Sequence, residues 1–430
     1  MTMQRVALRT GAWYGDRTMM LEFPDSWNVA VAEGQPLQAL TDEELRSRLR
    51  RPIGTRPLAE LARGRRRAAI IIDDIMRPTP TARLLPLILE ELERGGLPRS
   101  AVRVVIASGA HSPATPDDIR KKVGERLSAE LTVVAHQPQN DLIFLGRSAR
   151  GTPIHVNRTV ADSDLKIGVG GLYPHPVAGF SGGAKIFMPG VCGAETVRYV
   201  HDTFKGAGRR GGALDNAFRQ EAEAIAAAAG LEMVVDVILT PAREIAEAFA
   251  GDPVAAHREG VRAAAERYRV RVVPNADVVV ANAYPFDTSL YFIPRGFWPL
   301  ATGKRTASRV VVADGSMGQG YHGFQPPRQS LWSKARRGLG MLSPTAKGAS
   351  EWRVAATMLR KLFVRRQLEF LMCCPGLSEQ ELAAKYPKAR LFRKWEELLP
   401  VLEQRHLRGP VKVAVYPCAS LQLPMEATAR

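Results

Sequence analysis

The sequence has little of what marks a secreted or a membrane protein. Only four of its 430 residues are cysteines, none in a C-x-x-C spacing, and we expect free buried thiols in a reducing compartment. No apolar run approaches the roughly 18–20 residues that a membrane-spanning helix needs, and residues 1–9 lack the apolar stretch of a signal peptide. The sequence therefore predicts a cytoplasmic protein with no membrane partner.

Acidic residues are also scarce: 43 Asp and Glu stand against 60 Lys and Arg, for a formal net charge of +17. Such an excess is one mark of nucleic-acid-binding proteins. The basic residues are scattered, however, and neither local cluster, at residues 63–67 and 334–337, alternates with aromatic residues that would stack on bases. We therefore favour a solvated basic surface that attracts an anionic substrate and a phosphate-bearing cofactor.

What the sequence does contain is an alternation of short apolar runs with amphipathic stretches, which predicts helices on the faces of mostly parallel sheets. A hairpin is expected over residues 6–23, and Thr41 to Glu44 form a capping box at a helix start. The expected strands are residues 68–72, 102–107, 131–135, 165–168, 277–281, 309–313, 367–373 and 411–416. The expected helices are residues 81–97, 195–202, 213–229, 241–268, 351–362 and 395–404, with another beginning at Thr115.

These elements predict two α/β domains with mostly parallel sheets and an active-site crevice between them. The first domain is expected over residues 1–270 and the second over residues 271–408. Residues 409–430 are expected to return to the first domain, and residues 333–350, rich in Gly, Lys and Arg, to form a loop.

Polar clusters follow the apolar runs, where open α/β sheets place their ligand sites. One cluster follows residues 68–72 and contains Asp74 and Arg77, which together can hold an anion and orient a hydroxyl. Arginine suits an anion because its planar fork matches a carboxylate or a phosphate. The next cluster places His111 after residues 102–107, among small residues that let a ligand approach the backbone.

Two more clusters lie further along the chain. A glycine-rich stretch contains His175, Gly182, Gly183 and Lys185, and glycine-rich turns that end in a lysine often cradle phosphate through backbone N–H groups. It is not the Walker A pattern, which needs Ser or Thr after the lysine. His201 follows on a predicted helix, and histidine is the commonest neutral ligand for nickel-like metals.

The residue types themselves thus bring three histidines, a lysine, an arginine and an aspartate to one crevice. Two histidines near a bound acid suit general acid–base catalysis, since their pKa lies near neutral pH. The sequence has neither a Cys/His zinc spacing nor a G-x-S-x-G elbow. It predicts metal- or cofactor-assisted proton or hydride transfer on an anionic small molecule.

These clusters resemble the nickel-pincer nucleotide-dependent lactate racemase family. The resemblance rests on residues 74–78, 108–111 and 174–190, on the spacing from His175 through Lys185 to His201, and extends through Trp352. It implies a racemase or epimerase of a 2-hydroxy acid that works by hydride transfer to and from the cofactor through a 2-keto acid intermediate.

The cofactors that the resemblance implies are nickel and pyridinium-3,5-bisthiocarboxylic acid mononucleotide, the nickel-pincer nucleotide, which cofactor-synthesis proteins would supply. By resemblance, Lys185 carries the nucleotide covalently and His201 is the protein ligand to nickel. His111 and His175 match the acid/base pair. The other implied site residues are Asp74, Gly182 and Gly183 toward the cofactor, and Arg77, Tyr291, Phe292, Arg295 and Trp352 toward the substrate.

One stretch departs from the family. Its pattern there is Tyr-Gln-x-x-Lys, whereas this chain has Tyr291, Phe292 and Arg295 at the matching positions. Phe292 removes an amide, and Arg295 replaces a lysine with a longer, forked cation. We expect a more apolar or differently shaped pocket, and therefore carry over the reaction type more readily than lactate as the substrate.

Two alternatives stay open at this point. A metal-dependent isomerase or lyase acting on an anionic small molecule would use the same histidines without the pincer nucleotide. A basic nucleic-acid-binding protein would use the positive surface instead. An adduct on Lys185, seen by mass spectrometry, separates the first alternative from the racemase, and salt-dependent binding to an oligonucleotide would support the second.

Overall fold

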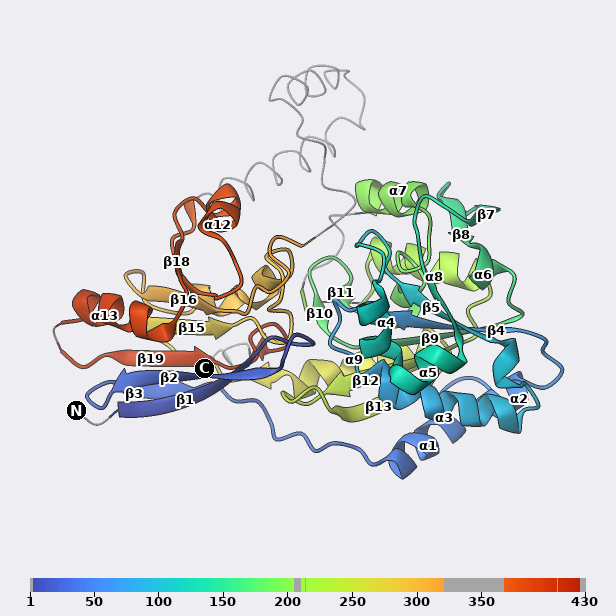
Figure 1. Ribbon diagram of the computed structural model, residues 1–430, viewed down its shortest axis with the longest axis horizontal. Helices are drawn as coiled ribbons and strands as arrows, with labels where there is room; N and C mark the ends of the chain where they lie inside the picture. Colours follow the sequence, from blue (N-terminus) through green and yellow to red (C-terminus); the bar gives the residue numbers. More distant parts are fainter. Residues whose placement is uncertain (1–2, 205–209, 213, 321–366, 408, 426–430) are drawn as a thin grey trace, which may run out of the picture.

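A computed structural model describes residues 3–204, 210–212, 214–320, 367–407 and 409–425 (Figure 1). Two six-stranded sheets form the centres of two halves that lie side by side. The predicted α/β class with mostly parallel sheets is confirmed. Trp352, the predicted loop at 333–350, the basic cluster at 334–337 and the predicted helix at 351–362 lie outside the described residues.

The first sheet has the strand order β13-β12-β9-β4-β5-β6, and only β13 runs antiparallel to its neighbour. Its strands are β4 (Ala68–Asp73), β5 (Val102–Ala107), β6 (Thr132–Ala135), β9 (Leu165–Gly171), β12 (Met233–Leu239) and β13 (Ile245–Gly251). All six residues of β4 are buried, which is why this strand reads as a continuous apolar run rather than an alternating one.

Helices cover both faces of this sheet, so that Ile70 and Ile72 pack into one apolar cluster and Ala69 and Ile71 into another. The helices of this half are α1 (Asp42–Arg50), α2 (Leu58–Leu61), α3 (Thr81–Arg94), α4 (Pro116–Val123), α5 (Glu125–Glu130), α6 (Arg158–Ala161), α7 (Ala194–Phe204), α8 (Ala217–Ala228) and α9 (Ala255–Arg267), with the short 3-10 segments η1 (Arg99–Ala101) and η2 (Gly183–Ile186).

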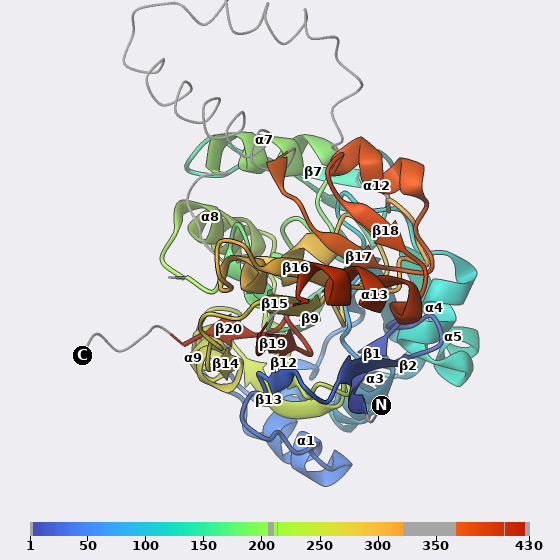
Figure 2. The same cartoon turned by 90° about the vertical axis from the view of Figure 1, so that its left-hand side faces the viewer.

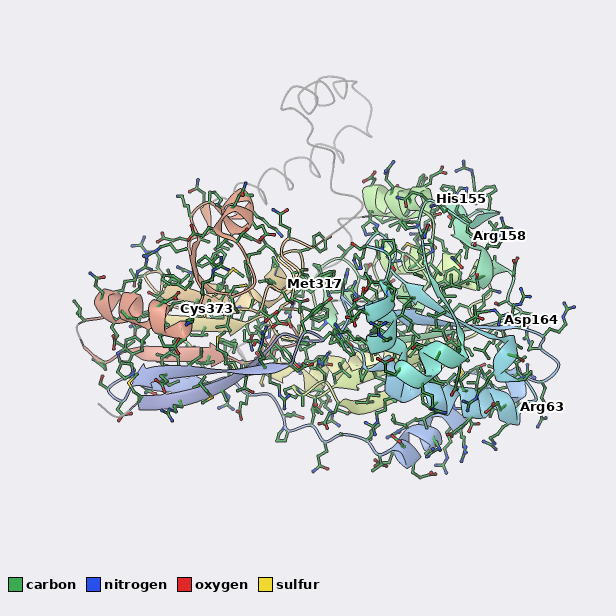
Figure 3. All side chains as sticks on the ribbon, viewed as in Figure 1. Arg63, His155, Arg158, Asp164, Met317 and Cys373 are labelled. Atoms are coloured by element: carbon green, nitrogen blue, oxygen red, sulfur yellow. The ribbon has the colours of Figure 1, made fainter. Side chains whose placement is uncertain are left out.

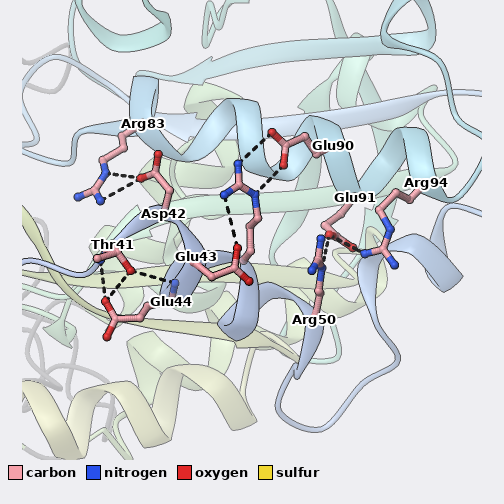
Figure 4. A network of polar contacts seen from close by, with 10 residues as sticks. Thr41, Asp42, Glu43, Glu44, Arg50, Arg83, Glu90, Glu91 and Arg94 are labelled. Atoms are coloured by element: carbon pink, nitrogen blue, oxygen red, sulfur yellow. Dashed lines mark hydrogen bonds and ion pairs between the residues drawn. The ribbon is translucent and has the colours of Figure 1, made fainter.

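Helix α1 packs on the first half through the buried Leu45 and Leu49, and ion pairs connect it to α3 (Figure 4). The predicted capping box is confirmed: Thr41 accepts from the backbone of Glu44, and the Glu44 carboxylate accepts from Thr41. The ion pairs across the two helices are Arg83 with Asp42, Arg46 with Glu90, and Arg50 with Glu91. Partly exposed pairs of this kind each contribute about 0–1 kcal/mol, so the network fixes orientation more than it adds stability.

The second sheet has the order β18-β17-β16-β15-β19-β3, with every neighbouring pair parallel. Figure 2 faces this half and labels β15 to β19. Its strands are β3 (Asn28–Val31), β15 (Val278–Asn282), β16 (Ser308–Val312), β17 (Leu371–Cys373), β18 (Arg390–Phe392) and β19 (Lys412–Tyr416). The described helical segments of this half are η3 (Ile293–Gly296), η4 (Trp298–Ala301), α12 (Glu379–Lys385) and α13 (Trp395–Arg405).

Strand pairing corrects the predicted course of both ends of the chain. The expected hairpin forms from β1 (Met3–Thr10) and β2 (Arg17–Pro24), but its apolar face packs with Val278 and Val280 of the second half, and β3 joins the second sheet. The predicted return of residues 409–430 to the first half is wrong for β19, which lies between β15 and β3. Both are pairings distant in sequence, which local apolar patterns do not encode.

One predicted helix is partly wrong. Residues 241–268 were expected to be helical, but residues 245–251 form β13, and the helix α9 begins only at Ala255. A turn at Arg243, whose φ is +65°, connects β12 to β13.

In the part of the chain that the structure describes, three further strand pairs lie outside the two large sheets. They are β7 (Leu142–Arg147) with β8 (Pro153–Asn157), β10 (Pro174–His175) with β11 (Gly179–Phe180), and β14 (Arg269–Val270) with β20 (Leu423–Pro424).

The two halves share an apolar contact. The cluster beneath the first sheet continues into Phe286, Phe292 and Leu421 of the second half, and Met317, labelled in Figure 3, packs against it. Side chains at the carboxyl ends of both sheets therefore meet around a shared apolar surface that includes Phe286 and Phe292, which we call the apolar floor. Among the described helices, none is both long enough and apolar enough to cross a membrane.

Candidate active site

The turn after β4 is built on a buried ion pair that sequence reasoning missed. The Lys122 ammonium donates to the Asp73 carboxylate at 2.6 Å and to the carbonyl of Thr79 at 2.8 Å. The Thr79 hydroxyl also bonds Asp73 and lies 2.8 Å from the hydroxyl of Tyr173. Because an unpaired buried charge is costly, this pairing holds the turn in one conformation. The turn presents the two predicted residues Asp74 and Arg77.

Asp74 and His111 form one unit. The His111 Nδ1 bonds the Asp74 carboxylate, and both side chains are largely buried. Burial lowers the pKa of His111 even though Asp74 opposes this, while His111 and Arg77 outweigh burial and lower the pKa of Asp74. A neutral imidazole therefore donates its Nδ1–H to an ionised carboxylate, which leaves the lone pair on Nε2. His111 is thus arranged as a base.

His175 has the opposite tautomer. Its Nδ1 accepts the backbone N–H groups of Val177 and Ala178, at 3.2 and 3.1 Å, so a neutral ring carries its proton on Nε2. Burial, followed by the charges of Lys185 and Arg295, holds the pKa of His175 well below its usual range. His175 is therefore arranged as a hydrogen-bond donor, and a proton on Nδ1 requires those two backbone bonds to be given up.

Phe292 lies among the cations of the site. The guanidinium carbon of Arg77 is 5.1 Å from the ring centroid, and that of Arg295 is 4.9 Å from it. The Nη1 atom of each arginine is buried without a hydrogen-bond partner, and so is Oδ1 of Asp74. Since Arg77 comes from the first half and Arg295 from the second, the two halves together present unsatisfied donors to an anion.

Tyr291 is more exposed than the neighbouring Phe292. Its ring packs edge-on against Phe292, with the centroids 5.0 Å apart, but the residue is 39% exposed. The predicted substrate residues Arg77, Phe292 and Arg295 are thus brought together by the fold, with Tyr291 at their edge.

Lys185 lies on η2, and its surroundings weaken its charge. Burial and then the charges of Arg77, Arg295 and Arg219 hold the pKa of its amine well below the usual range. A neutral amine is the nucleophilic form of lysine. The charge of Lys185 also lowers the pKa of His111 and of His175, so the lysine lies within electrostatic range of both histidines.

The glycines before Lys185 are held from behind by residues that the sequence did not single out. The Gly183 N–H donates to the buried Asp236 carboxylate at 2.7 Å, and Arg219 donates to the carbonyl of Gly182 at 2.9 Å. The Gly183 N–H is therefore already used and is not available to a phosphate. Both glycines have positive φ, and a Cβ at Gly183 would lie 2.6 Å from the ring of His257. Close packing thus explains these glycines better than phosphate binding does.

Burial has opposite effects on the two charged groups behind the loop. It raises the pKa of Asp236 to about 7 and lowers that of Arg219 to about 10, because both are taken out of water. Asp236 lies in the middle of β12, a strand whose buried apolar run was not predicted. An aspartate inside such a run was the one sequence signal that pointed to this support.

His201 lies on α7, where its Nδ1 donates to the carbonyl of Val197 at 2.8 Å and its ring packs edge-on against Phe218. These contacts hold its ring against α7 and α8. The Nδ1–H tautomer puts the lone pair on Nε2, the arrangement that metal-binding histidines adopt. Among the described residues, no group of three or more His, Cys, Asp or Glu side chains is placed to hold a metal.

The basic surface is partly neutralised where the structure describes it. In the cluster at residues 63–67, which lies at the outer end of the first half (Figure 3), Arg65 pairs with Glu232 at 2.8 Å and Arg66 lies 3.9 Å from Asp164. This arrangement supports a solvated basic surface.

Comparisons with known proteins point to one family. Residues 14–211 match the lactate racemase N-terminal domain. The chain is 30% identical over 290 residues to a lactate racemase of Lactiplantibacillus plantarum, covering 66% of this chain and 68% of that protein. It is 29% identical over 325 residues to a lactate racemase of Thermoanaerobacterium thermosaccharolyticum, covering 72% and 76%.

Solved structures share the fold. The lactate racemase apoprotein from T. thermosaccharolyticum superposes with a TM-score of 0.72 at 23% identity, covering 98% of this chain and all of the other. A protein from Thermotoga maritima superposes with a TM-score of 0.62 at 16% identity, covering 90% and 99%. At these identities the likeness shows the arrangement of the two halves.

Proposed function

Because the chain belongs to the lactate racemase family, we propose that it is a racemase or epimerase that inverts C2 of a 2-hydroxy acid. The observation that carries the proposal is the pair of opposite tautomers. His111 presents a lone pair and His175 a proton. The two enantiomers of the acid present the oxygen on C2 to opposite sides of the site. Inversion therefore needs one group that takes the proton from the hydroxyl on one side and another that binds the oxygen on the opposite side, and this pair provides both.

The residues present also fit the nickel-pincer nucleotide. Lys185 has the depressed pKa that a covalent linkage through a neutral amine requires. His201 has the metal-binding tautomer. A metal held by this histidine would take further donors from the sulfur-bearing arms of the nucleotide. When bound, this cofactor would supply a reversible acceptor for the hydride of C2.

The side chains of this protein have three tasks in that reaction. Arg77 and Arg295 bind the substrate carboxylate, which accepts hydrogen bonds from the two buried Nη1 atoms that have no partner. His111, oriented by Asp74, is placed to take the proton of the C2 hydroxyl. The 2-keto acid would result when C2 also gives up its hydride to the acceptor that the cofactor would supply. His175 donates a hydrogen bond from Nε2 to the oxygen when it lies on the other side. To give a proton to that oxygen, His175 must also carry one on Nδ1, so the Val177 and Ala178 N–H groups release this atom. Solvent supplies that proton and takes up the one that His111 received, so that protons balance.

The apolar floor keeps water away from the reacting carbon. Phe286 and Phe292 are 2% and 4% exposed, and both rings lie against the guanidinium of Arg295, at 4.7 and 4.9 Å. A low local dielectric strengthens the pairing between guanidinium and carboxylate. The two rings also limit the size of the substituent on C2, so the preferred acid depends on how its substituent fits against Phe292.

The test is a stereochemical assay on protein purified from a host that also makes the cofactor-synthesis proteins. Single-enantiomer 2-hydroxy acids of increasing substituent size are incubated with it, and both enantiomers are quantified by chiral chromatography. We expect inversion of at least one acid by protein that carries nickel and an adduct on Lys185. Failure of fully loaded protein to invert any acid would contradict the proposal. Inversion by protein without an adduct would favour an isomerase that does not use the nucleotide.

A further inference from the structure

The N-terminal hairpin reaches the active site through its tip, residues 11–16. The indole Nε1–H of Trp13 donates to the backbone carbonyl of Arg77 at 3.0 Å. Lys122 donates to the same carbonyl at 3.3 Å and lies 5.1 Å from the centroid of the Trp13 ring. Two donors from different parts of the chain thus hold the peptide that carries the Arg77 side chain.

The other side of the tip is built onto the second half. The Gly11 N–H donates to the buried Asp287 carboxylate at 2.7 Å, and the Ala12 N–H donates to it at 3.4 Å. Arg17 pairs with Asp314, just after β16. These contacts fix the tip at the carboxyl-end edge of the second sheet, the edge from which Arg295 also comes.

Cations of the first half close around the same tip. The guanidinium carbon of Arg243 lies 4.3 Å from the Trp13 ring centroid, and the Lys121 ammonium lies 4.3 Å from that of Tyr14. Trp13 has φ +69°, a conformation rare for a bulky side chain, which persists only where its surroundings enforce it. The tip therefore bridges the two halves behind the site.

From these contacts we infer that Trp13 is a positioning residue for substrate binding: it sets the Arg77 turn relative to the second half. Arg77 and Arg295 converge on Phe292 although they belong to different halves. The hairpin tip connects the same two halves through Asp287 on one side and the Arg77 carbonyl on the other. Without the indole N–H, the Arg77 peptide loses its hydrogen bond to the hairpin tip. The Arg77 guanidinium is then no longer held where it can bind the substrate carboxylate together with Arg295. This role rests on the proposed binding of a 2-hydroxy acid.

The test compares Trp13→Phe, which keeps an aromatic ring but removes the N–H, with Trp395→Phe as a matched control. Trp395 also donates its indole N–H to a backbone carbonyl, that of Glu22 at 2.8 Å, but within the second half. A neutral hydrogen bond contributes about 0.5–1.5 kcal/mol, so we expect KM for the acid to rise roughly 2- to 13-fold in Trp13→Phe, with a smaller change in kcat. Trp395→Phe should lower stability and leave KM unchanged.

A second measurement needs neither cofactor nor substrate. The Arg77 N–H donates to the carbonyl of Asp74 at 3.0 Å, so hydrogen exchange of this amide reports on the turn. We expect faster exchange in Trp13→Phe and no change in Trp395→Phe. Unchanged exchange in Trp13→Phe would overturn the inference, and so would faster exchange with an unaltered KM. If the unaltered protein turns over no acid while the exchange result holds, the positioning of the turn stands and the proposed function fails.

Discussion

The ring of Phe292 meets the imidazole of His111 edge-on, with the ring centroids 5.2 Å apart and the planes at 89°. The same ring lies against the guanidinium groups of Arg77 and Arg295. One aromatic side chain thus touches the proposed base and both proposed carboxylate ligands. It stands where the family pattern has a glutamine.

We expect the double substitution Phe292→Gln with Arg295→Lys to shift preference toward lactate. The change removes ring bulk next to C2 and restores a hydrogen-bonding amide, and one methylene-sized difference in a pocket is worth about 10- to 200-fold in specificity. The measurement is the ratio of kcat/KM for lactate to that for the best acid of the unaltered enzyme. Phe297→Leu, a change in an aromatic ring packed on Phe370 in the second half, serves as the control. A ratio that stays constant, or lactate as the best substrate already, would show that these positions do not set specificity.

Lys185→Ala should abolish the covalent adduct and nearly all activity, because the low-pKa amine is the proposed attachment point. The readout is the intact mass of protein purified from a cofactor-producing host. Lys166→Ala is the matched control, since burial lowers the pKa of Lys166 too, but its ammonium donates to the carbonyl of Ser163. An unchanged adduct in Lys185→Ala, or its loss in Lys166→Ala, would contradict the assignment.

The three site histidines should separate by role. His111→Ala and His175→Ala are expected to reduce turnover by about 10²- to 10⁴-fold, the usual contribution of general acid–base groups, with the cofactor still bound. His201→Ala is expected to lose nickel instead. Metal content by elemental analysis and adduct mass are measured beside activity, with His155→Ala, a histidine paired with Glu195 on the β8–α7 surface, as the control. Equal nickel content in all three site variants would disprove this division.

The pH dependence follows from the lowered pKa values of His111 and His175. The ring that takes the substrate proton must be neutral, so kcat/KM should stay level as the pH falls through 6.5 and decline only below it. The same shifts reduce stability in acid: the unfolded chain binds protons near pH 6.5 that the folded chain excludes, so the free energy of unfolding falls below that pH.

Asp74→Asn tests the origin of this dependence. The Asp74 charge stabilises an imidazolium at His111, and the amide oxygen of asparagine can still accept the Nδ1–H. Removing the charge should therefore lower the His111 pKa further and move the acid side of the kcat/KM profile to lower pH. A shift toward higher pH would mean that another group controls that side.

Much of the secondary structure was predictable because burial leaves a local signature. The continuous apolar run of β4 and the capping box at Thr41 depend on residues close in sequence. For the same reason, Asp74, Arg77 and His111 were placed correctly after their strands, since the carboxyl ends of parallel strands share one edge. The sequence alone therefore determined the fold class and most of the candidate side chains.

Tertiary structure decided what depends on partners distant along the chain. β3 and β19 are apolar runs of ordinary composition, and only pairing with each other and with β15 assigns them to the second sheet. A histidine's tautomer is set by the group its ring bonds, so the base and the donor became distinct only when Asp74 and the Val177 N–H were in place. Trp13 likewise gained a role only when folding brought its indole, 64 residues away in sequence, to the Arg77 carbonyl.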